Sequence, residues 1–208
     1  MNVELLGVFG DDRQIAETAW VSSNRGDPSD PERIRKLIKM LAEEGHETPF
    51  ESVVTRWKIE APQRIQVQLL RHRMASHNVA SARYNHKFKE VYPFSEQAEQ
   101  EGLEMRELMV LEELANSCLI QYNKLLENTK NHHNKKRIRE LAAFALPQGV
   151  MSSQVMTINL RSLKNLIALR SSEHAQREIR EIAENMKLYL RLETGLQHTV
   201  QYYFGGAE

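Results

Sequence analysis

In the stretch VVTRWKIE, residues 53–60, apolar or hydroxyl-bearing side chains alternate with charged ones from Thr55 onward. Side chains two residues apart point to the same face of a β-strand, so Val53, Thr55, Trp57 and Ile59 would share one face. This period of two predicts a strand with one face buried in a core. The segments on either side of it carry different signals.

Helices are predicted on both sides of this strand. Before it, Asp30 is an expected N-cap, and Pro31 suits the first position of a helix that ends near Gly45. After it, Pro62 opens a second helix. The polar residues 73–85 follow without an apolar period and are predicted to form a loop.

The remaining segments add strands and helices. Two strands are predicted at residues 2–9 and 150–159. Apolar periodicity predicts helices around residues 15–20, 95–129 with a break near residue 102, 135–145, 162–170, 174–192 and 193–203. A few strands among many helices indicate the α+β class.

Length and composition bound the kind of protein. A chain of 208 residues, 41% hydrophobic, fits one globular domain or two small ones. Its 28 basic and 28 acidic residues cancel, so no overall field attracts nucleic acid or an acidic membrane. The single cysteine, Cys118, allows no intrachain disulfide and is expected to be buried in an apolar helix. We expect neither a secretory signal nor a membrane-spanning segment, and we recognise no metal-binding or phosphate-loop motif.

The densest polar cluster begins with two arginines that flank a histidine at residues 71–73. The planar guanidinium fork of arginine suits phosphate oxygens, although cations at a helix end also complement the helix dipole. Ser81 and Arg83 would point the same way in an extended loop and could hold a phosphate or a ribose hydroxyl. A solvated loop with local hydrogen bonds is the alternative. The cluster indicates an anion site without naming the anion.

A second polar stretch is GHETPFES, residues 45–52. Thr48 is the expected N-cap of a short helical turn, with Glu51 three residues later completing a capping box. This reading explains Thr48 and Glu51 but leaves His46 without a role.

A third polar stretch is TINLRSLKNLIALRSSEHAQ, residues 157–176. Arg161 and Asn165 are four residues apart and would share a helical face. Arg170 comes at the end of the same predicted helix, where a cation also complements the helix dipole.

These stretches together resemble a known family. Arg-His-Arg, seven residues and then Ser, here residues 71–81, is the signature of the flavin-dependent thymidylate synthases. Further blocks are similar to those of the family and come in the same order: GHETPFE (45–51), SARY (81–84), NLRSLKN (159–165) and LRSSEHAQ (169–176). The resemblance covers roughly residues 5–203.

The resemblance implies a single domain over residues 1–208 with the α+β fold of that family, a small sheet packed with several helices. It implies a cytoplasmic homotetramer whose active sites lie where subunits meet, with no nucleic acid polymer, membrane or metal as partner. It implies methylation of dUMP at carbon 5 to dTMP, with FAD reduced by NADPH and with methylenetetrahydrofolate as the carbon donor. The cofactor would then supply the hard chemistry, which suits a chain without a plausible nucleophilic cysteine.

Site residues are carried over by matching position. Those that would contact FAD are His46, Thr48, Arg71, His72, Arg73, Asn159, Arg161 and Asn165, with the last three coming from another subunit. Those that would bind dUMP are Gln68, Arg71, Ser81, Ala82, Arg83 and Arg170. Arg170 would act as the catalytic residue: it would lie against the uracil and favour its N3-deprotonated form, since a nearby opposite charge lowers a pKa.

Two positions depart from the pattern of the family. An acid is common two residues before the motif serine, where this chain has Val79, and an arginine is common where it has Ala143. Arg139, one helical turn earlier, could substitute for the second. Both positions fall near the expected nucleotide site, so another uridine nucleotide such as UMP is an alternative substrate.

A non-catalytic nucleotide or RNA-binding module is the second alternative. It is motivated by the cations of residues 71–83 and by NHHNKKRIR at residues 131–139, which could grip phosphates. The zero net charge and the ordered family blocks weigh against it.

Overall fold

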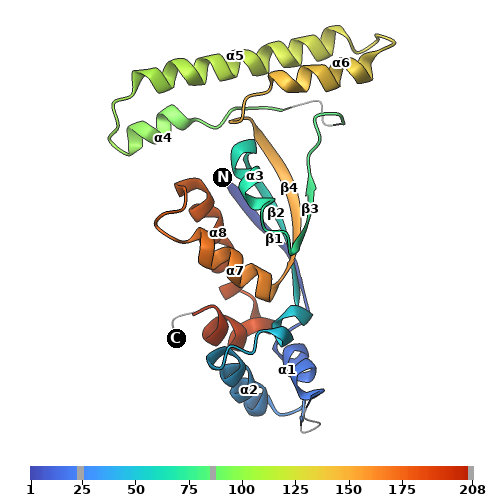
Figure 1. Cartoon of the computed structure of the whole chain (residues 1–208), viewed down its shortest axis with the longest axis vertical. Coiled ribbons are helices and arrows are strands. Elements are labelled where there is room, and N and C mark those ends of the chain that lie inside the picture. Colours follow the sequence, from blue (N-terminus) through green and yellow to red (C-terminus); the bar gives the residue numbers. More distant parts are fainter. Residues whose placement is uncertain (23–25, 85–87, 206–208) are drawn as a thin grey trace. The chain divides into compact units, whose positions relative to one another are not determined.

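Four antiparallel strands form one sheet, in the order β1-β2-β4-β3, in the computed structural model of the chain (Figure 1). The structure describes residues 1–22, 26–84 and 88–205, so Asn85, at the end of the predicted 73–85 loop, lies outside the described residues. The strands are β1 (Asn2–Phe9), β2 (Val54–Pro62), β3 (Ala75–Val79) and β4 (Met151–Asn159). Three of them confirm predicted strands, and β3 was not predicted.

Helices make up much of the rest of the described chain and confirm the predicted α+β class. The α-helices are α1 (Asp12–Trp20), α2 (Pro31–Glu43), α3 (Gln63–Leu69), α4 (Phe94–Gln100), α5 (Arg106–Asn128), α6 (Lys135–Ala142), α7 (Leu160–Arg170) and α8 (Arg177–Arg191). The shorter helical turns are η1 (Thr48–Ser52), η2 (Ala143–Ala145), η3 (Thr194–Leu196) and η4 (Thr199–Tyr203). None of the described helices combines the length and the apolar character that crossing a membrane requires.

Helix ends follow the expected chemistry. The Asp30 carboxylate accepts hydrogen bonds from the backbone N–H groups of Glu32 and Arg33 at 3.0 and 3.3 Å and so caps α2. Gly45, just beyond the end of α2, has a φ of 70°, and Gly102, between α4 and α5, has a φ of 75°. Glycine adopts this left-handed conformation without steric cost, which explains both stops.

The inner face of β2 is buried as predicted. Val53, Thr55, Trp57 and Ile59 are all fully buried. The Trp57 indole Nε1 donates to Thr55 Oγ1 at 2.8 Å, and Thr55 Oγ1 donates to the carbonyl of Ile158 in β4 at 3.0 Å. Buried polar atoms need such partners, so this chain of bonds ties β2 to β4 inside the core.

Contacts divide the chain into two compact units. Unit 1 comprises Met1–Ile59, Arg71–His77 and Val155–Glu208, and unit 2 comprises Glu60–Leu70 and Asn78–Gln154. Within unit 1, α1 and α2 pack together with η1 and η4, α7 packs on α8, and α8 also contacts β1. The buried Asp12 carboxylate accepts from the backbone N–H groups of His198 and Thr199 at 2.7 and 3.1 Å, which joins α1 to the C-terminal segment.

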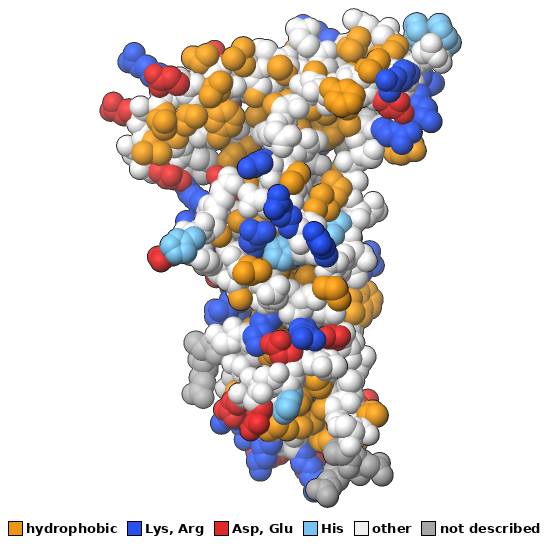
Figure 2. All heavy atoms as spheres, in the orientation of Figure 1, with side chains coloured by type: hydrophobic (Ala, Val, Ile, Leu, Met, Phe, Trp, Pro, Cys, Tyr) orange, Lys and Arg blue, Asp and Glu red, His pale blue; other side chains and the backbone are white. Residues whose placement is uncertain are grey.

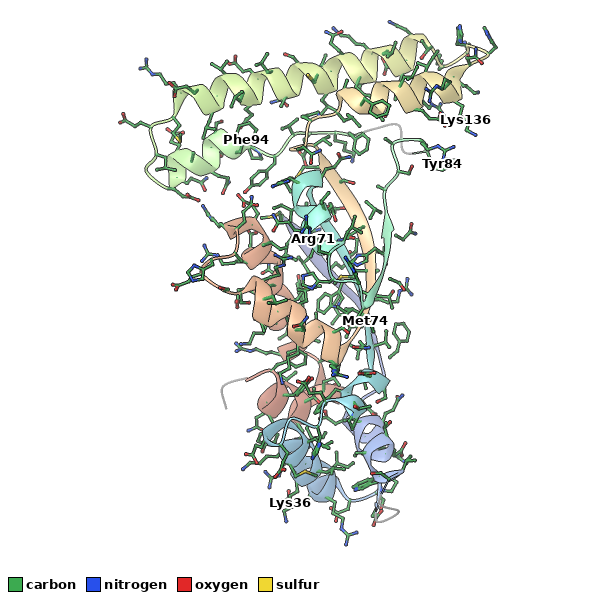
Figure 3. The ribbon with its side chains drawn as sticks, viewed as in Figure 1. Lys36, Arg71, Met74, Tyr84, Phe94 and Lys136 are labelled. Carbon is green, nitrogen blue, oxygen red and sulfur yellow. The ribbon has the colours of Figure 1, made fainter. Side chains whose placement is uncertain are left out.

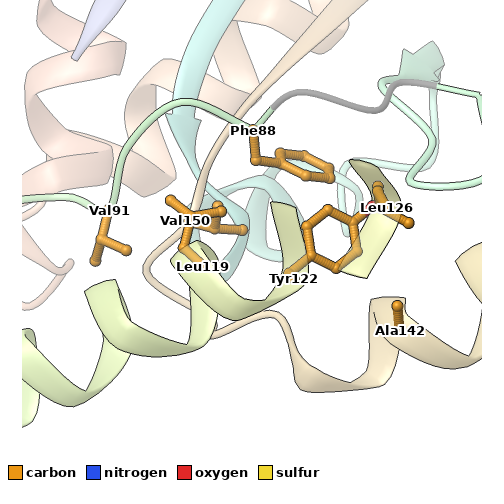
Figure 4. Packing of buried hydrophobic residues seen from close by; sticks show 7 residues of the cluster. All are labelled: Phe88, Val91, Leu119, Tyr122, Leu126, Ala142 and Val150. Atoms are coloured by element: carbon orange, nitrogen blue, oxygen red, sulfur yellow. The ribbon is translucent and has the colours of Figure 1, made fainter. Parts of the chain in front are cut away.

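Unit 2 has its own apolar core between α5, α6 and the chain that enters β4 (Figure 4). Its buried members are Phe88, Val91, Leu119, Tyr122, Leu126, Ala142 and Val150. Cys118 is exposed, so the prediction that it is buried is wrong. Residues 119, 122 and 126 repeat at helical spacing and form the buried face of α5, and Cys118 is one position off that face.

Two predicted segments fold differently in the middle of the chain. Residues 75–79 form strand β3 rather than a loop, because they pair with β4 at the edge of the sheet, and the next residue continues the pairing with a bond from Ala80 N to Ser153 O at 2.8 Å. An edge strand that is half exposed can be polar, which hid it from the apolar pattern. The capping box at Thr48 is also wrong: Thr48 is the first residue of η1, Glu47 precedes it, and η1 has no side-chain cap.

The C-terminal helices also differ from the prediction. Helix α8 begins at Arg177 rather than at residue 174. The predicted helix over residues 193–203 is replaced by the short 3-10 turn η3 and the π-helical turn η4. The backbone N–H groups of His198 and Thr199 bond to Asp12, so a tertiary contact displaces the regular helical pattern here.

Candidate active site

A cleft of about 750 Å³ opens on unit 1. This volume lies in the range of small-molecule and cofactor sites. Three segments that are far apart in the sequence line it: η1 with the residue before it, the turn at residues 71–74, and the end of β4 with α7. Seven predicted site residues meet there, namely Arg71, His72, Arg73, Asn159, Arg161, Asn165 and Arg170.

The turn at residues 71–74 links the end of α3 to the start of β3, and Arg71 and Met74 are labelled on it in Figure 3. Only residues 70–74 separate α3 from β3, so the Arg-His-Arg triplet lies in a short connection. Arg71 and Arg73 are exposed, and His72 between them is half-buried. The triplet therefore lines the cleft with two exposed guanidinium groups and a half-buried imidazole between them.

Helix α7 starts directly after β4 and supplies the opposite wall. Asn159 is its N-cap, and Asn159 Oδ1 accepts from the backbone N–H of Ser162 at 2.8 Å. Arg161 and Asn165 follow at a four-residue spacing, and Arg170 occupies the last turn. The shared helical face predicted for Arg161 and Asn165 is consistent with their common place in the cleft wall.

A hydrogen bond joins the two walls of the cleft. Arg170 Nε donates to His72 Nε2 at 3.0 Å, and both side chains are partly buried. Burial first, and then the nearby Arg170 and His77, lower the pKa of His72 to about 4. The imidazole is therefore neutral near pH 7.

The cleft also contains acidic side chains that the sequence did not assign to it. Glu47 Oε1 accepts from Lys164 Nζ at 3.0 Å, and Glu47 Oε2 lies 3.5 Å from Arg161 Nε. Glu51 accepts a hydrogen bond from Arg161. The hydrogen bond from Lys164 holds the pKa of Glu47 below its usual range. Arg161 and Lys164 thus enter the cleft with their charges partly compensated.

Glu51 was missed because the capping box accounted for it, and Glu47 and Lys164 were given no role. The spacing of these charged residues in the sequence is a signal that could have revealed them. Arg161 and Lys164 are three apart on α7, and Glu47 and Glu51 are four apart across η1, so each pair places like charges on one side of its element.

An aromatic pair supports the acidic wall. Phe50 and Tyr203 stack with their ring centroids 3.7 Å apart and their planes 3° from parallel, and Lys164 Nζ lies 3.8 Å from the Tyr203 centroid. Burial and the nearby Glu47 carboxylate raise the pKa of Tyr203 well above its ordinary value. Tyr203 is therefore a neutral, apolar support for η1 and for Lys164.

Other predicted site residues do not line this cleft. His46 and Thr48 are exposed on either side of Glu47, which does line it. The rest belong to unit 2 and are Gln68, Ser81, Ala82 and Arg83. Within that unit, Arg83 lies 3.2 Å from Glu140 and stacks beside Tyr84, and the backbone N–H of Arg83 donates to Ser81 Oγ at 3.3 Å.

The charge on the cleft is arranged in two groups. On the face shown in Figure 2, Lys, Arg and His side chains gather over the turn at residues 71–74, and basic side chains meet acidic ones over η1 and the start of α7. The first group suits an anion such as a phosphate. Apolar side chains in the same cleft, among them Ile158 and Leu169, suit a planar ring.

Comparison with known proteins gives this arrangement a family. The family model described as thymidylate synthase complementing protein matches residues 4–192. The flavin-dependent thymidylate synthase of Pseudothermotoga lettingae is 36% identical over 182 residues, covering 87% of this chain and 80% of the relative. That of Thermosipho africanus is 34% identical over 197 residues, covering 88% and 83%.

A solved structure shares the fold. The UMP/dUMP methylase PolB from Streptomyces cacaoi, bound with 5-Br dUMP, superposes with a TM-score of 0.74 at 24% identity and covers 98% of this chain and 94% of its own. Since the family model spans most of the chain and the relatives match along most of their own length, the chain belongs to the flavin-dependent thymidylate synthases, a family of methyltransferase enzymes.

Proposed function

We propose that the chain methylates dUMP at carbon 5 to give dTMP, with methylenetetrahydrofolate as the carbon donor and FAD reduced by NADPH. Residues 1–208 would act as one domain in this reaction, in the cytoplasm, where these metabolites are found. The observation that carries the proposal is the cleft of unit 1, where the Arg-His-Arg turn meets Asn159, Arg161 and Arg170. Membership of an enzyme family weighs against the non-catalytic binding module.

The side chains of the cleft fit a flavin dinucleotide. Arg71 and Arg73 offer guanidinium groups to the pyrophosphate. Arg161 and Lys164 are paired with Glu47 and Glu51, so they would orient the pyrophosphate rather than neutralise its charge. The amides of Asn159 and Asn165, with His46, Thr48 and His72, complete the proposed FAD-binding set. When bound and reduced, the flavin supplies the hydride that the methylation needs.

The nucleotide would be held by Gln68, Arg71, Ser81, Ala82 and Arg83, with Arg170 against the uracil. Arg83 is already paired with Glu140, so a phosphate bound there would compete with that carboxylate. A guanidinium beside the uracil would lower the pKa of N3, because a positive charge favours the ionised base. Protein groups would thus bind and orient the reactants, and carbon 5 would need no attack by a cysteine. Cys118 lies in an apolar groove of unit 2, and such surroundings do not activate a thiol for nucleophilic attack.

UMP is the second candidate substrate. Val79 and Ala143 replace an acid and an arginine that are common in the family, and PolB, which shares the fold, is named a UMP/dUMP methylase. Val79 is the last residue of β3, and Ala143 begins η2. Arg139 lies one turn before Ala143 on α6 and is the proposed replacement phosphate ligand.

Anaerobic turnover with separated nucleotides tests this proposal. The purified protein is incubated with NADPH and methylenetetrahydrofolate and with either dUMP or UMP, and the products are identified by mass. We expect dTMP from dUMP. Faster methylation of UMP would replace dUMP by the second candidate, and no methylation of either nucleotide by a flavin-loaded preparation would overturn the proposed function.

We also propose that the enzyme is a homotetramer. Its support is an apolar surface on unit 2, where Figure 2 shows hydrophobic side chains gathered over α4 and α5. Exposed large apolar side chains of unit 2 include Met109, Val110, Leu111, Leu114 and Ile120 on α5 and Phe144 in η2. Exposed apolar side chains that gather on one face mark interaction sites. Sedimentation equilibrium should give four times the chain mass, and a monomer at assay concentration would contradict the proposal.

A further inference from the structure

The hydrogen bond between Arg170 and His72 has a chemical direction. An arginine Nε–H can only donate, so His72 Nε2 must be the acceptor and carries no proton. A neutral imidazole has one N–H, which places the proton of His72 on Nδ1. The contact therefore selects both the charge state and the tautomer of His72.

The groups around His72 hold it in that state. Arg71 and Arg73 flank it in the turn, Arg170 approaches from α7, and His77 Nε2 lies 3.2 Å from the His72 carbonyl oxygen. Because a carbonyl oxygen only accepts, His77 is the donor and anchors the backbone of the turn. A proton on His72 Nε2 would remove the acceptor and place a second cation 3.0 Å from the Arg170 side chain.

We propose that His72 is a positioning residue, whose neutral imidazole accepts the Arg170 hydrogen bond and fixes the guanidinium at the place where it meets the nucleotide. This rests on the proposed function of Arg170. The three residues of the triplet then have different roles. Arg71 and Arg73 bind anions, and the neutral His72 orients Arg170 on the opposite wall. A long side chain at a helix end loses orientation without such a fixed partner.

Histidine-labelled NMR of the flavin-free protein tests the contact without any turnover. We expect the His72 ring to carry its proton on Nδ1 and to titrate near pH 4. Arg170→Met removes the donor and the nearby charge, so the pKa of His72 should rise toward the ordinary histidine value of about 6.5. Arg191→Met, at the last turn of α8, is the matched control and should leave the His72 signals unchanged. Titration of wild-type His72 near 6.5, or the same His72 pKa in wild type and Arg170→Met, would overturn the inference.

Kinetics provide a second readout. His72→Gln keeps an acceptor oxygen near the position of Nε2, whereas His72→Leu keeps bulk and removes the acceptor. We expect His72→Leu to lower kcat about ten- to hundredfold, the range for one hydrogen bond to a charged group, and His72→Gln to recover most of it. Equal losses of kcat in the two flavin-loaded variants would assign His72 to another role.

The two arms separate the possible failures. If the wild-type enzyme methylates neither nucleotide, the proposed function fails, and the NMR titration still decides whether His72 holds Arg170. If the enzyme is active and the titration shows no coupling, only the positioning role fails. Circular dichroism of each variant excludes misfolding as the cause of a loss.

Discussion

Replacing Arg170 with alanine should lower the rate of methylation by about 100- to 1,000-fold while the flavin stays bound. This is the range for removing one preorganised donor that stabilises developing charge in an active site. Arg170 is joined to the opposite wall of the cleft through its hydrogen bond to His72. Its loss should therefore act on the bound nucleotide and leave the anion grip of Arg71 and Arg73 intact.

The measurement is single-turnover methylation with flavin-loaded enzyme, alongside the visible flavin spectrum after gel filtration. Arg191→Ala is the matched control, because Arg191 also ends a helix and complements its dipole but lies on α8 outside the cleft. Activity near wild type in Arg170→Ala would remove the catalytic assignment. Equal losses in both variants would indicate a helix-end effect on stability instead.

Replacing Arg73 with alanine should weaken FAD binding by about 10- to 100-fold. A hydrogen bond between charged groups contributes roughly 1.5–3 kcal/mol, and each 1.4 kcal/mol is tenfold in affinity. Arg73 is exposed in the cleft, at the middle of the turn that offers guanidinium groups to a pyrophosphate. Arg161, by contrast, already shares its charge with Glu47 and Glu51 and can compensate only in part.

Fluorescence titration of the apoprotein with FAD measures this effect directly. Arg13→Ala serves as the control, because Arg13 is an exposed arginine of the same unit whose pairing with Glu17, at 2.8 Å on α1, is the kind of surface contact that contributes little. Unchanged FAD affinity in Arg73→Ala would show that the pyrophosphate is held elsewhere. The same loss in Arg13→Ala would point to a general charge effect.

Local signals in the sequence were enough for the elements that carry strong periodicity or clear caps. The alternation around Trp57 predicted β2 and its buried face, and Asp30 and Gly45 bounded α2. The helix predicted at residues 162–170 is α7, which begins two residues earlier, after the Asn159 cap. Such signals depend on a few neighbouring residues, so they survive in the folded chain.

Contacts between distant segments could not be found in this way. Strand β3 is polar because it lies at a sheet edge, and only its pairing with β4 makes it a strand. Glu51 looked like part of a capping box with Thr48, yet it binds Arg161, 110 residues further along the chain. The hydrogen bond between His72 and Arg170 spans 98 residues, and no spacing rule connects them. Composition predicted an anion site, and the three-dimensional arrangement determined its partners.

The stack of Phe50 on Tyr203 means that the C-terminal segment supports the acidic wall of the cleft. Phe50 lies between Glu47 and Glu51 in the chain, and Lys164 rests over the Tyr203 ring, so the carboxylates and their cation share one aromatic support. The last helical turn of the described chain, η4, therefore contacts the wall of the proposed cofactor cleft through the Tyr203 ring. Shortening the protein from that end, or fusing another domain close to it, would therefore disturb the acidic side of the cleft, although the two lie far apart in the sequence.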